Sequence, residues 1–274
     1  EPKRTSMAYG LHNYLMNDPA YMQLYGIEGG NERLPRELAA RLEATVLLEH
    51  RVKEIAGTGV ERIRIASSNG AGERSDEFDF VVVALPHGDL RRLSFSGERL
   101  AEAVRNHCDR YDFPAHYLRI TILFRTPFWR QTISDSYWML DQFDGCCLYD
   151  ESSREPEAPH GVLGWLLGGE AAERMSALPD EELIAAALDS LPPFLAAGRE
   201  EFVEGRIHRW LGAVNGMPGG QAPPNLDRRH QPEPLEHSRL FLVGDYMFDS
   251  TLNGVLDSAE YVASWIASQI ADAA

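Results

Sequence analysis

The chain has 274 residues, enough for one large domain or two small ones, and its 44% hydrophobic and 25% charged residues are ordinary for a folded globular protein. Its 42 Asp and Glu outnumber its 26 Lys and Arg, which gives a net charge of −16. Because this negative field repels phosphate backbones and anionic lipid surfaces, we expect no nucleic acid and no membrane as partners.

The cysteines, Cys108, Cys146 and Cys147, are odd in number and lack metal-ligand spacing, so a disulfide framework and a zinc site are both excluded. The histidines are scattered without ligand spacing, and we expect no metal. The longest apolar runs, such as residues 80–85, are far shorter than the roughly 20 residues that cross a bilayer, and no apolar segment follows the first four residues as in a signal peptide. We therefore expect a reduced, cytoplasmic protein.

The first part of the chain predicts one short helix and several strands. Leu34, Leu38 and Leu42 recur every four residues, which predicts an amphipathic helix over residues 35–42. The polar, glycine-containing residues 67–74 predict a turn. Apolar or alternating runs predict strands, the last of them buried on both faces, at residues 45–48, 52–55, 60–65 and 78–84.

The middle of the chain predicts an antiparallel sheet with helices packed on it. Side chains alternate over residues 117–124, and a helix is expected over about residues 180–191. Further strands are expected at residues 136–140, 161–167 and 201–203. The proline-rich residues 218–234 predict irregular chain, followed by a buried strand over residues 239–245 and a helix over about residues 254–271. The fold class is α/β with α+β character.

The strand, loop and helix at the C-terminal end form the most informative local pattern. Asp245 ends a buried strand, where a carboxylate can accept hydrogen bonds from ribose or ribityl hydroxyls. Asn253, Gly254 and Val255 begin the next helix, whose N–H groups and positive dipole end favour an electron-rich acceptor such as the O2 edge of a flavin. An ordinary helix N-cap explains the same pattern.

Five landmarks in order resemble the C-terminal half of the flavin-containing amine oxidase superfamily, which includes monoamine, polyamine and L-amino acid oxidases. They are Glu28-Gly29-Gly30 with Leu34 and Leu38-Ala39, the strand at 52–55, the strand and turn at 81–86, Pro127-Phe128-Trp129, and Val243-Gly244-Asp245 with Asn253-Gly254-Val255. The resemblance implies that residues 1–112 form part of an FAD-binding domain and residues 113–212 a substrate-binding domain. Residues 213–274 would contribute the strand and helix that contact FAD.

The same resemblance implies which residues bind FAD. Gly29 and Gly30 would let the backbone approach the cofactor, and Val52 would hold the adenine through main-chain groups. Asp245, after Gly244, would bind the ribityl chain. The Val255 N–H, in the helix opened by Asn253 and Gly254, would face the flavin O2. The dinucleotide would also be lined by Ala84, Leu85 and Pro86.

Catalytic and substrate roles follow from the resemblance as well. Arg119 takes the position at which the family has a lysine that reaches the flavin N5 through a water, and arginine keeps the charge but stays protonated. Trp210 would form one wall of an aromatic cage for the substrate, while Tyr246 and Thr251 stand near the second wall. A solvent-facing position for Arg119 and a core position for Trp210 stay open as alternatives. Additional polar-aromatic candidates for the pocket wall are residues 12–14 and 149–150.

No GxGxxG turn follows a strand and opens a helix in these 274 residues, although the superfamily begins with one. We therefore expect a second polypeptide to carry that half, through a split gene or cleavage, unless the sequence is a fragment. The expected function is a subunit or portion of an FAD-dependent oxidoreductase that oxidises an amine or amino acid by hydride transfer to flavin, with O2 as acceptor. The alternatives are a flavin-dependent desaturase or dehydrogenase acting on a C–C bond, which the Gly244-Asp245-Tyr246 pattern favours, and a non-catalytic subunit that kept the fold.

Overall fold

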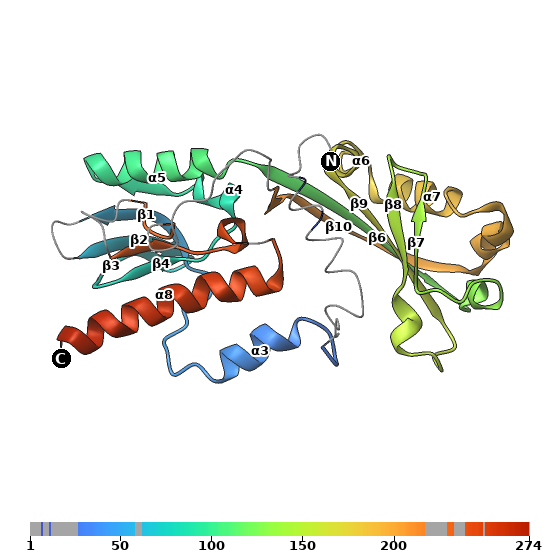
Figure 1. The fold of residues 1–274 in the computed structure, drawn as a ribbon, viewed down its shortest axis with the longest axis horizontal. Helices are drawn as coiled ribbons and strands as arrows, with labels where there is room; N and C mark the ends of the chain where they lie inside the picture. The colour runs from blue at the N-terminus through green and yellow to red at the C-terminus, as the bar shows by residue number, and fades with distance from the viewer. Residues whose placement is uncertain are drawn as a thin grey trace.

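The computed structural model describes residues 7, 11, 27–57, 62–216, 229–232, 239–248 and 250–273. Within these residues the chain forms two lobes that are joined by the long strands β6 (Pro114–Phe124) and β10 (Phe202–Asn215) (Figure 1). The second lobe is built from residues 114–215, and the first lobe from the described residues on either side of them. No helix in the described part of the chain is both long enough and apolar enough to span a bilayer.

The first lobe contains a four-stranded sheet in the order β3-β2-β1-β5. Its strands are β1 (Arg51–Gly57), β2 (Ile63–Asn69), β3 (Gly72–Phe78) and β5 (Ser94–Ser96). The first three pair antiparallel, and β5 runs parallel to β1. The short helix α4 (His87–Leu90) and the helix α5 (Glu98–Arg110) pack beside the sheet (Figure 1), and the core between them includes Ile55, Leu90, Leu100 and Val104.

A separate two-stranded parallel sheet pairs β4 (Val81–Val83) with β11 (Leu240–Leu242). The C-terminal helix α8 (Leu252–Ala273) packs against β11, with Val262 and Trp265 against Phe241. All three residues of β11 are buried, as the apolar run predicted, but Val82 in β4 is 44% exposed. Helix α8 therefore covers β11 and leaves part of β4 uncovered.

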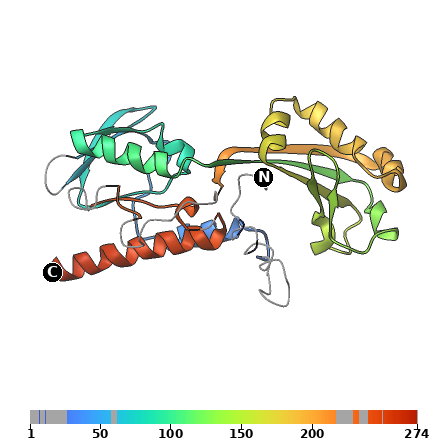
Figure 2. The same cartoon turned by 45° about the horizontal axis from the view of Figure 1, so that its top comes forward.

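The second lobe is a five-stranded antiparallel sheet in the order β10-β6-β9-β8-β7. Its other strands are β7 (Tyr137–Leu140), β8 (Cys146–Asp150) and β9 (Gly161–Gly168). The helices α6 (Gly169–Met175) and α7 (Asp180–Asp189), drawn in yellow in Figure 2, lie on one face together with the 3-10 segment η3 (Pro193–Glu201). Leu118, Ile120, Ile122 and Phe124 of β6 are fully buried on that face. The predicted α/β class, with an antiparallel sheet and packed helices, is confirmed.

Several predicted elements are wrong in detail. Residues 45–48 form no strand, because they follow α3 as irregular, exposed chain and no strand in the described part of the chain pairs with them. Residues 67–74 are mostly a β2–β3 hairpin that turns at residues 70–71. The single strand predicted over residues 78–84 is divided between the end of β3 and β4. The strand predicted at residues 201–203 is only the start of β10. The sequence pattern did not predict β8, α5 or α6.

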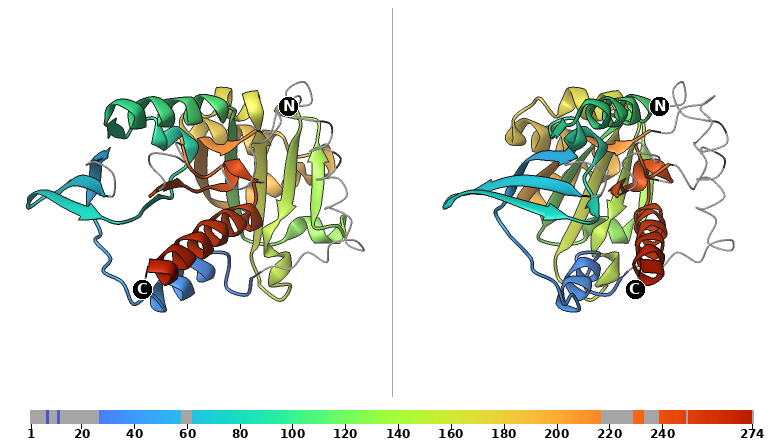
Figure 3. Two further views of the ribbon diagram at one scale, coloured as in Figure 1. Left: turned by 60° about the vertical axis from the view of Figure 1, so that its left-hand side comes forward. Right: turned by 90° about the vertical axis from the view of Figure 1, so that its left-hand side faces the viewer.

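The predicted N-terminal helix exists as α3 (Arg33–Ala40), but its apolar face is unpacked. None of its residues is buried, Leu38 is 51% exposed, and Leu42 just beyond it is 59% exposed. Figures 1 and 3 show α3 apart from the three sheets. The leucine spacing thus predicted the helix correctly, while the described residues leave its apolar face uncovered.

Candidate active site

The face of the five-stranded sheet opposite α6 and α7, here called the open face, presents side chains in rows that run across the strands. The strand register places Trp210 beside Tyr117 in one row. The next row contains His208, Arg119, Leu166, Cys147 and Met139. The row after that contains Arg206, Thr121, Gly164, Tyr149 and Tyr137. Arg119 and Trp210, the two predicted catalytic residues, therefore lie on the same face in adjacent rows.

Aromatic rings stand at one end of the open face. Trp210 and Tyr117 are 40% and 38% exposed, and the His208 ring stacks on Trp210 with centroids 5.7 Å apart and planes inclined by 12°. Trp210 is consequently not a core residue, although that reading was open from the sequence. A half-exposed pair of aromatic side chains can bind the apolar part of a small molecule.

Arg119 forms an ion pair with Glu151 on the open face. The guanidinium Nη2 donates a hydrogen bond to Glu151 Oε1, and the two side chains are only 35% and 24% exposed. The neighbouring strand residue is Gly164, where an added Cβ would lie 3.1 Å from Glu151 Oε1 and 3.5 Å from Arg119 Nη2. The absence of a side chain at Gly164 thus leaves room for the pair against the sheet.

Glu151 is held in place by its buried neighbour Asp150. Asp150 accepts hydrogen bonds from the Ser152 amide at 3.0 Å, the Trp129 indole at 3.0 Å and Arg130 Nε at 3.2 Å, and it caps the 3-10 segment η2 (Glu151–Arg154). Burial raises the Asp150 pKa, but these hydrogen bonds outweigh it and hold the pKa below its ordinary value. Asp150 is therefore a structural residue.

Tyr149, which the sequence analysis named with Asp150 as a candidate for the pocket wall, lies on the open face. Burial raises its pKa, and the neighbouring Cys147 and Glu151 raise it further, so the phenol stays protonated at neutral pH.

The predicted cofactor residues around β4 and β11 meet at one edge of the parallel sheet. Leu242 pairs with Val83, and the Val243 amide donates to the Val83 carbonyl at 3.0 Å, so Ala84 and Asp245 both follow the carboxyl ends of paired parallel strands. This edge is where open α/β sheets bind ligands. Ala84 is exposed, while Leu85, Gly244 and Asp245 are half-buried.

Gly244 is required at this edge for packing. An added Cβ would overlap the Tyr246 ring, and the Gly244 amide donates to the buried Ser258 Oγ at 3.0 Å. The hydrogen bond ties the end of β11 to helix α8 and fixes the loop that carries Asp245.

The first turn of α8 uses donors that the sequence assigned to a ligand. Thr251 caps the helix, because its Oγ1 accepts from the Gly254 amide at 3.1 Å, and the Val255 amide donates to the Thr251 carbonyl at 3.2 Å. The side chains of Asn253 and Val255 are exposed. The expected contact between the Val255 N–H and a flavin stays a prediction, and in this arrangement that donor already has a partner inside the helix.

Other predicted site residues lie away from the open face. Tyr246 is 4% exposed and packs edge-on against His87 and Tyr111 in the first-lobe core, so it offers little surface to a substrate. Gly29 and Gly30, with φ of 82° and 92°, form a turn before α3 that favours glycine. Val52 is half-buried on the first-lobe core. Residues 12–14 lie outside the described residues.

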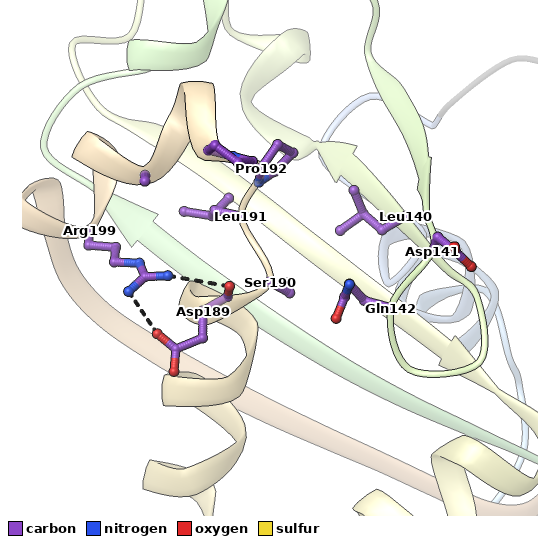
Figure 4. Close-up of a pocket in the computed structure, with 10 residues that line it drawn as sticks. Leu140, Asp141, Gln142, Asp189, Ser190, Leu191, Pro192 and Arg199 are labelled. Carbon is purple, nitrogen blue, oxygen red and sulfur yellow. Dashed lines mark hydrogen bonds and ion pairs between the residues drawn. The ribbon is translucent and has the colours of Figure 1, made fainter.

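The hollow in Figure 4 contains none of the predicted site residues. It is bordered by the Asp189–Arg199 ion pair, whose closest atoms are 2.9 Å apart, and by residues of the β7–β8 turn, with Leu140, Gln142, Leu191 and Pro192 among its lining residues. Among the described residues, no cluster of His, Cys, Asp and Glu has the arrangement of a metal site.

Sequence and structure comparisons identify the family. The family model described as flavin containing amine oxidoreductase matches residues 4–267. The chain belongs to this family. Among curated proteins, no sequence matches the chain.

The chain also resembles solved structures in its fold. Cyclohexylamine oxidase from Brevibacterium oxydans IH-35A is 19% identical with a TM-score of 0.69, and the alignment covers 98% of this chain and 61% of that one. A putative protoporphyrinogen oxidase from Exiguobacterium sp. 255-15 is 18% identical with a TM-score of 0.69, over 88% and 51%. Putrescine oxidase bound to putrescine is 19% identical with a TM-score of 0.61, over 88% and 53%. The chain therefore spans about half to three fifths of the length of these proteins.

Three residues of the open face were not predicted as site residues from the sequence: Tyr117, His208 and Glu151. Tyr117 and His208 each stand two positions from a predicted residue on the same strand, so the period of two could have found them. Glu151 had no such signal, because it is 32 positions from Arg119 and meets it only through the sheet.

Proposed function

We propose that this chain is the C-terminal portion of an FAD-dependent oxidoreductase that oxidises an amine or amino acid, with O2 as the electron acceptor. The observation that carries the proposal is the open face, where Trp210, Tyr117 and Arg119 present aromatic and cationic groups on a sheet whose other face packs against α6 and α7. Helix α8 begins on the same side of the sheet, opposite α6 and α7 (Figure 2). The family match supports the chemistry.

The carboxyl edge of β4 and β11 fits part of FAD. Small or apolar side chains at Ala84 and Leu85 and a half-buried carboxylate at Asp245 suit a dinucleotide and its hydroxyls. These residues would hold the cofactor, which supplies the hydride acceptor when bound. The chain carries no glycine-rich turn to cradle the pyrophosphate.

We further propose that a second polypeptide supplies the half with the glycine-rich turn. The parallel sheet of β4 and β11 has only two strands among the described residues, whereas parallel sheets are normally larger and covered on both faces. Val82 on β4 and the apolar side of α3 are exposed, as expected of surfaces that another part of the enzyme covers.

The residues of the open face would then orient and desolvate the substrate. Trp210 and Tyr117 would pack on its apolar part and exclude water from the reacting carbon. An arginine side chain carries N–H donors and no acceptor, so Arg119 cannot accept the proton of an ammonium substrate, and the amine must arrive neutral or lose its proton to solvent.

The first test is a visible absorption spectrum of the natively purified protein beside a denaturing gel of the same fraction. We expect the two bands of oxidised flavin, a second polypeptide on the gel, and hydrogen peroxide release with a panel of amines. A colourless sample that contains the full native complex contradicts the proposal and favours a non-catalytic subunit. Flavin without peroxide from any amine favours a desaturase or dehydrogenase instead.

A substitution at Trp210 tests the open face directly. Trp210→Ala should lower kcat/KM for amines by about tenfold or more, because the ring would orient the substrate, with little loss of stability since the ring is 40% exposed. Phe194→Ala is the matched control, since Phe194 is a 61% exposed aromatic in η3 on the helical face. Equal kinetics in the two variants would remove Trp210 from the site.

A further inference from the structure

The positive charge on the open face is paired with carboxylates. Arg119 on the interior strand β6 bonds to Glu151, and Arg206 on the edge strand β10 pairs with Glu204 at 3.3 Å. The two pairs differ in exposure. Arg206 and Glu204 are 74% and 54% exposed, whereas Arg119 and Glu151 are 35% and 24% exposed, so solvent screens the Arg119–Glu151 pair much less.

The Arg119–Glu151 pair is held in its geometry by the residues around Glu151. Glu151 stands between Asp150 and Ser152, which are bonded to each other twice, through the Ser152 amide at 3.0 Å and the Ser152 hydroxyl at 2.6 Å. Gly164 beneath the pair leaves it room. Glu151 is therefore ordered before any ligand arrives, and a competing carboxylate from solution must displace it while losing its own translational freedom.

We propose that Glu151 is a specificity-determining residue, which keeps Arg119 from binding a carboxylate and thereby selects amines without a carboxylate group. This inference rests on the proposed function, because it narrows the substrate of the same open face from amines and amino acids to amines. It assigns Glu151 no contact with the reacting atoms. Its effect is exerted through Arg119.

The test measures binding of benzoate and of its uncharged analogue benzamide to the natively purified protein by calorimetry at pH 8. In Glu151→Gln, which keeps the shape and removes the charge, benzoate should bind about tenfold more tightly than in the wild type, since a charge-assisted hydrogen bond to Arg119 becomes available. Benzamide binding should change less than twofold.

Two further variants locate the effect. Glu204→Gln is the matched control, because it releases the exposed Arg206 and should leave benzoate binding within twofold of the wild type. The double variant Arg119→Gln/Glu151→Gln should lose the gain. The inference is overturned if Glu151→Gln binds benzoate no better than the wild type, or if Glu204→Gln gives the same gain.

A second substitution covers the case in which Glu151→Gln does not fold. Arg119→Gln leaves the Glu151 carboxylate without its partner, and benzylammonium should then bind about tenfold more tightly relative to benzyl alcohol. An unchanged ratio overturns the inference. Amine turnover by the wild type is measured in parallel. Turnover without the benzoate gain overturns this inference alone, and the benzoate gain without turnover supports the Arg119–Glu151 assignment and overturns the proposed function.

Discussion

Asp150 is the last residue of strand β8 and directly precedes Glu151. It is 5% exposed and bonded to Trp129, Arg130 and Ser152. Asp150→Ala would leave Arg130 and the Trp129 indole without their buried partner, and we expect a loss of about 3 kcal/mol in the free energy of unfolding, measured by urea denaturation. Asp109→Ala is the control, because Asp109 pairs with Arg91 in an exposed bridge on helix α5, and this substitution should cost less than about 0.5 kcal/mol. Equal losses in the two variants would show that the buried hydrogen bonds of Asp150 stabilise the fold no more than an exposed ion pair does.

His107 makes the fold sensitive to acid. Burial lowers its pKa to about 3, with a smaller contribution from the nearby charges of His87 and Arg110. Since the unfolded histidine has a pKa of about 6.5, only the unfolded state binds this proton between pH 6.5 and 3. The stabilisation is complete above pH 6.5 and is lost as the pH falls toward 3, at up to about 1.4 kcal/mol per pH unit.

Denaturation at pH 7, 6 and 5 checks this window, in which Asp150 contributes little because its pKa is below that of an ordinary carboxyl. His107→Phe should flatten the pH dependence, since His107 Nε2 has no hydrogen-bond partner among the described residues and the neighbours Tyr111 and Tyr246 are aromatic. An unchanged slope in this variant would assign the acid sensitivity to other groups.

At the scale of an element, α8 depends on its cap. Thr251 Oγ1 accepts the Gly254 amide, and an alanine at the N-cap costs about 1 kcal/mol in typical helices. We expect Thr251→Ala to lower the free energy of unfolding by that amount. Thr251→Ser keeps the hydroxyl and should leave the free energy of unfolding unchanged. Thermal or urea denaturation measures both. If Thr251→Ser lowers amine turnover while keeping the stability, its methyl group contacts the substrate, as the sequence resemblance implied.

The elements found from the sequence are those whose side-chain pattern is complete within one segment. Residues 117–124 alternate strictly, because every second side chain of β6 enters the core. The strand β10 escaped prediction beyond residue 203, because it lies at the edge of its sheet and its outward side chains include Glu204, Arg206 and His208. A charged outer face and a glycine at residue 205 remove the apolar signal that strand prediction needs.

At the scale of the whole molecule, exposed apolar side chains mark where we expect the second polypeptide. Val82 lies on the side of β4 that α8 leaves partly uncovered and is 44% exposed. Val82→Lys should leave the stability of this chain nearly unchanged but weaken its association with the other half by at least about tenfold, because a lysine would be buried without a partner. Co-purification with a tagged chain measures the association.

Val203→Lys serves as the control, since Val203 is 48% exposed on β10, in the other lobe. Val203→Lys should co-purify like the wild type. If both variants or neither of them lose the second polypeptide, Val82 is not part of the contact.

The sequence by itself determined the α/β class, the positions of β1, β6, β9 and α7, and the residue order that matches an amine oxidoreductase, because periodicity and motif order are local or linear properties. Only the tertiary structure decided which side chains meet. It placed Trp210 beside Tyr117 and buried Tyr246 in the core. It also brought Glu151 to Arg119 across 32 positions of sequence. Strand register and packing set those distances, and neither is encoded in any single segment.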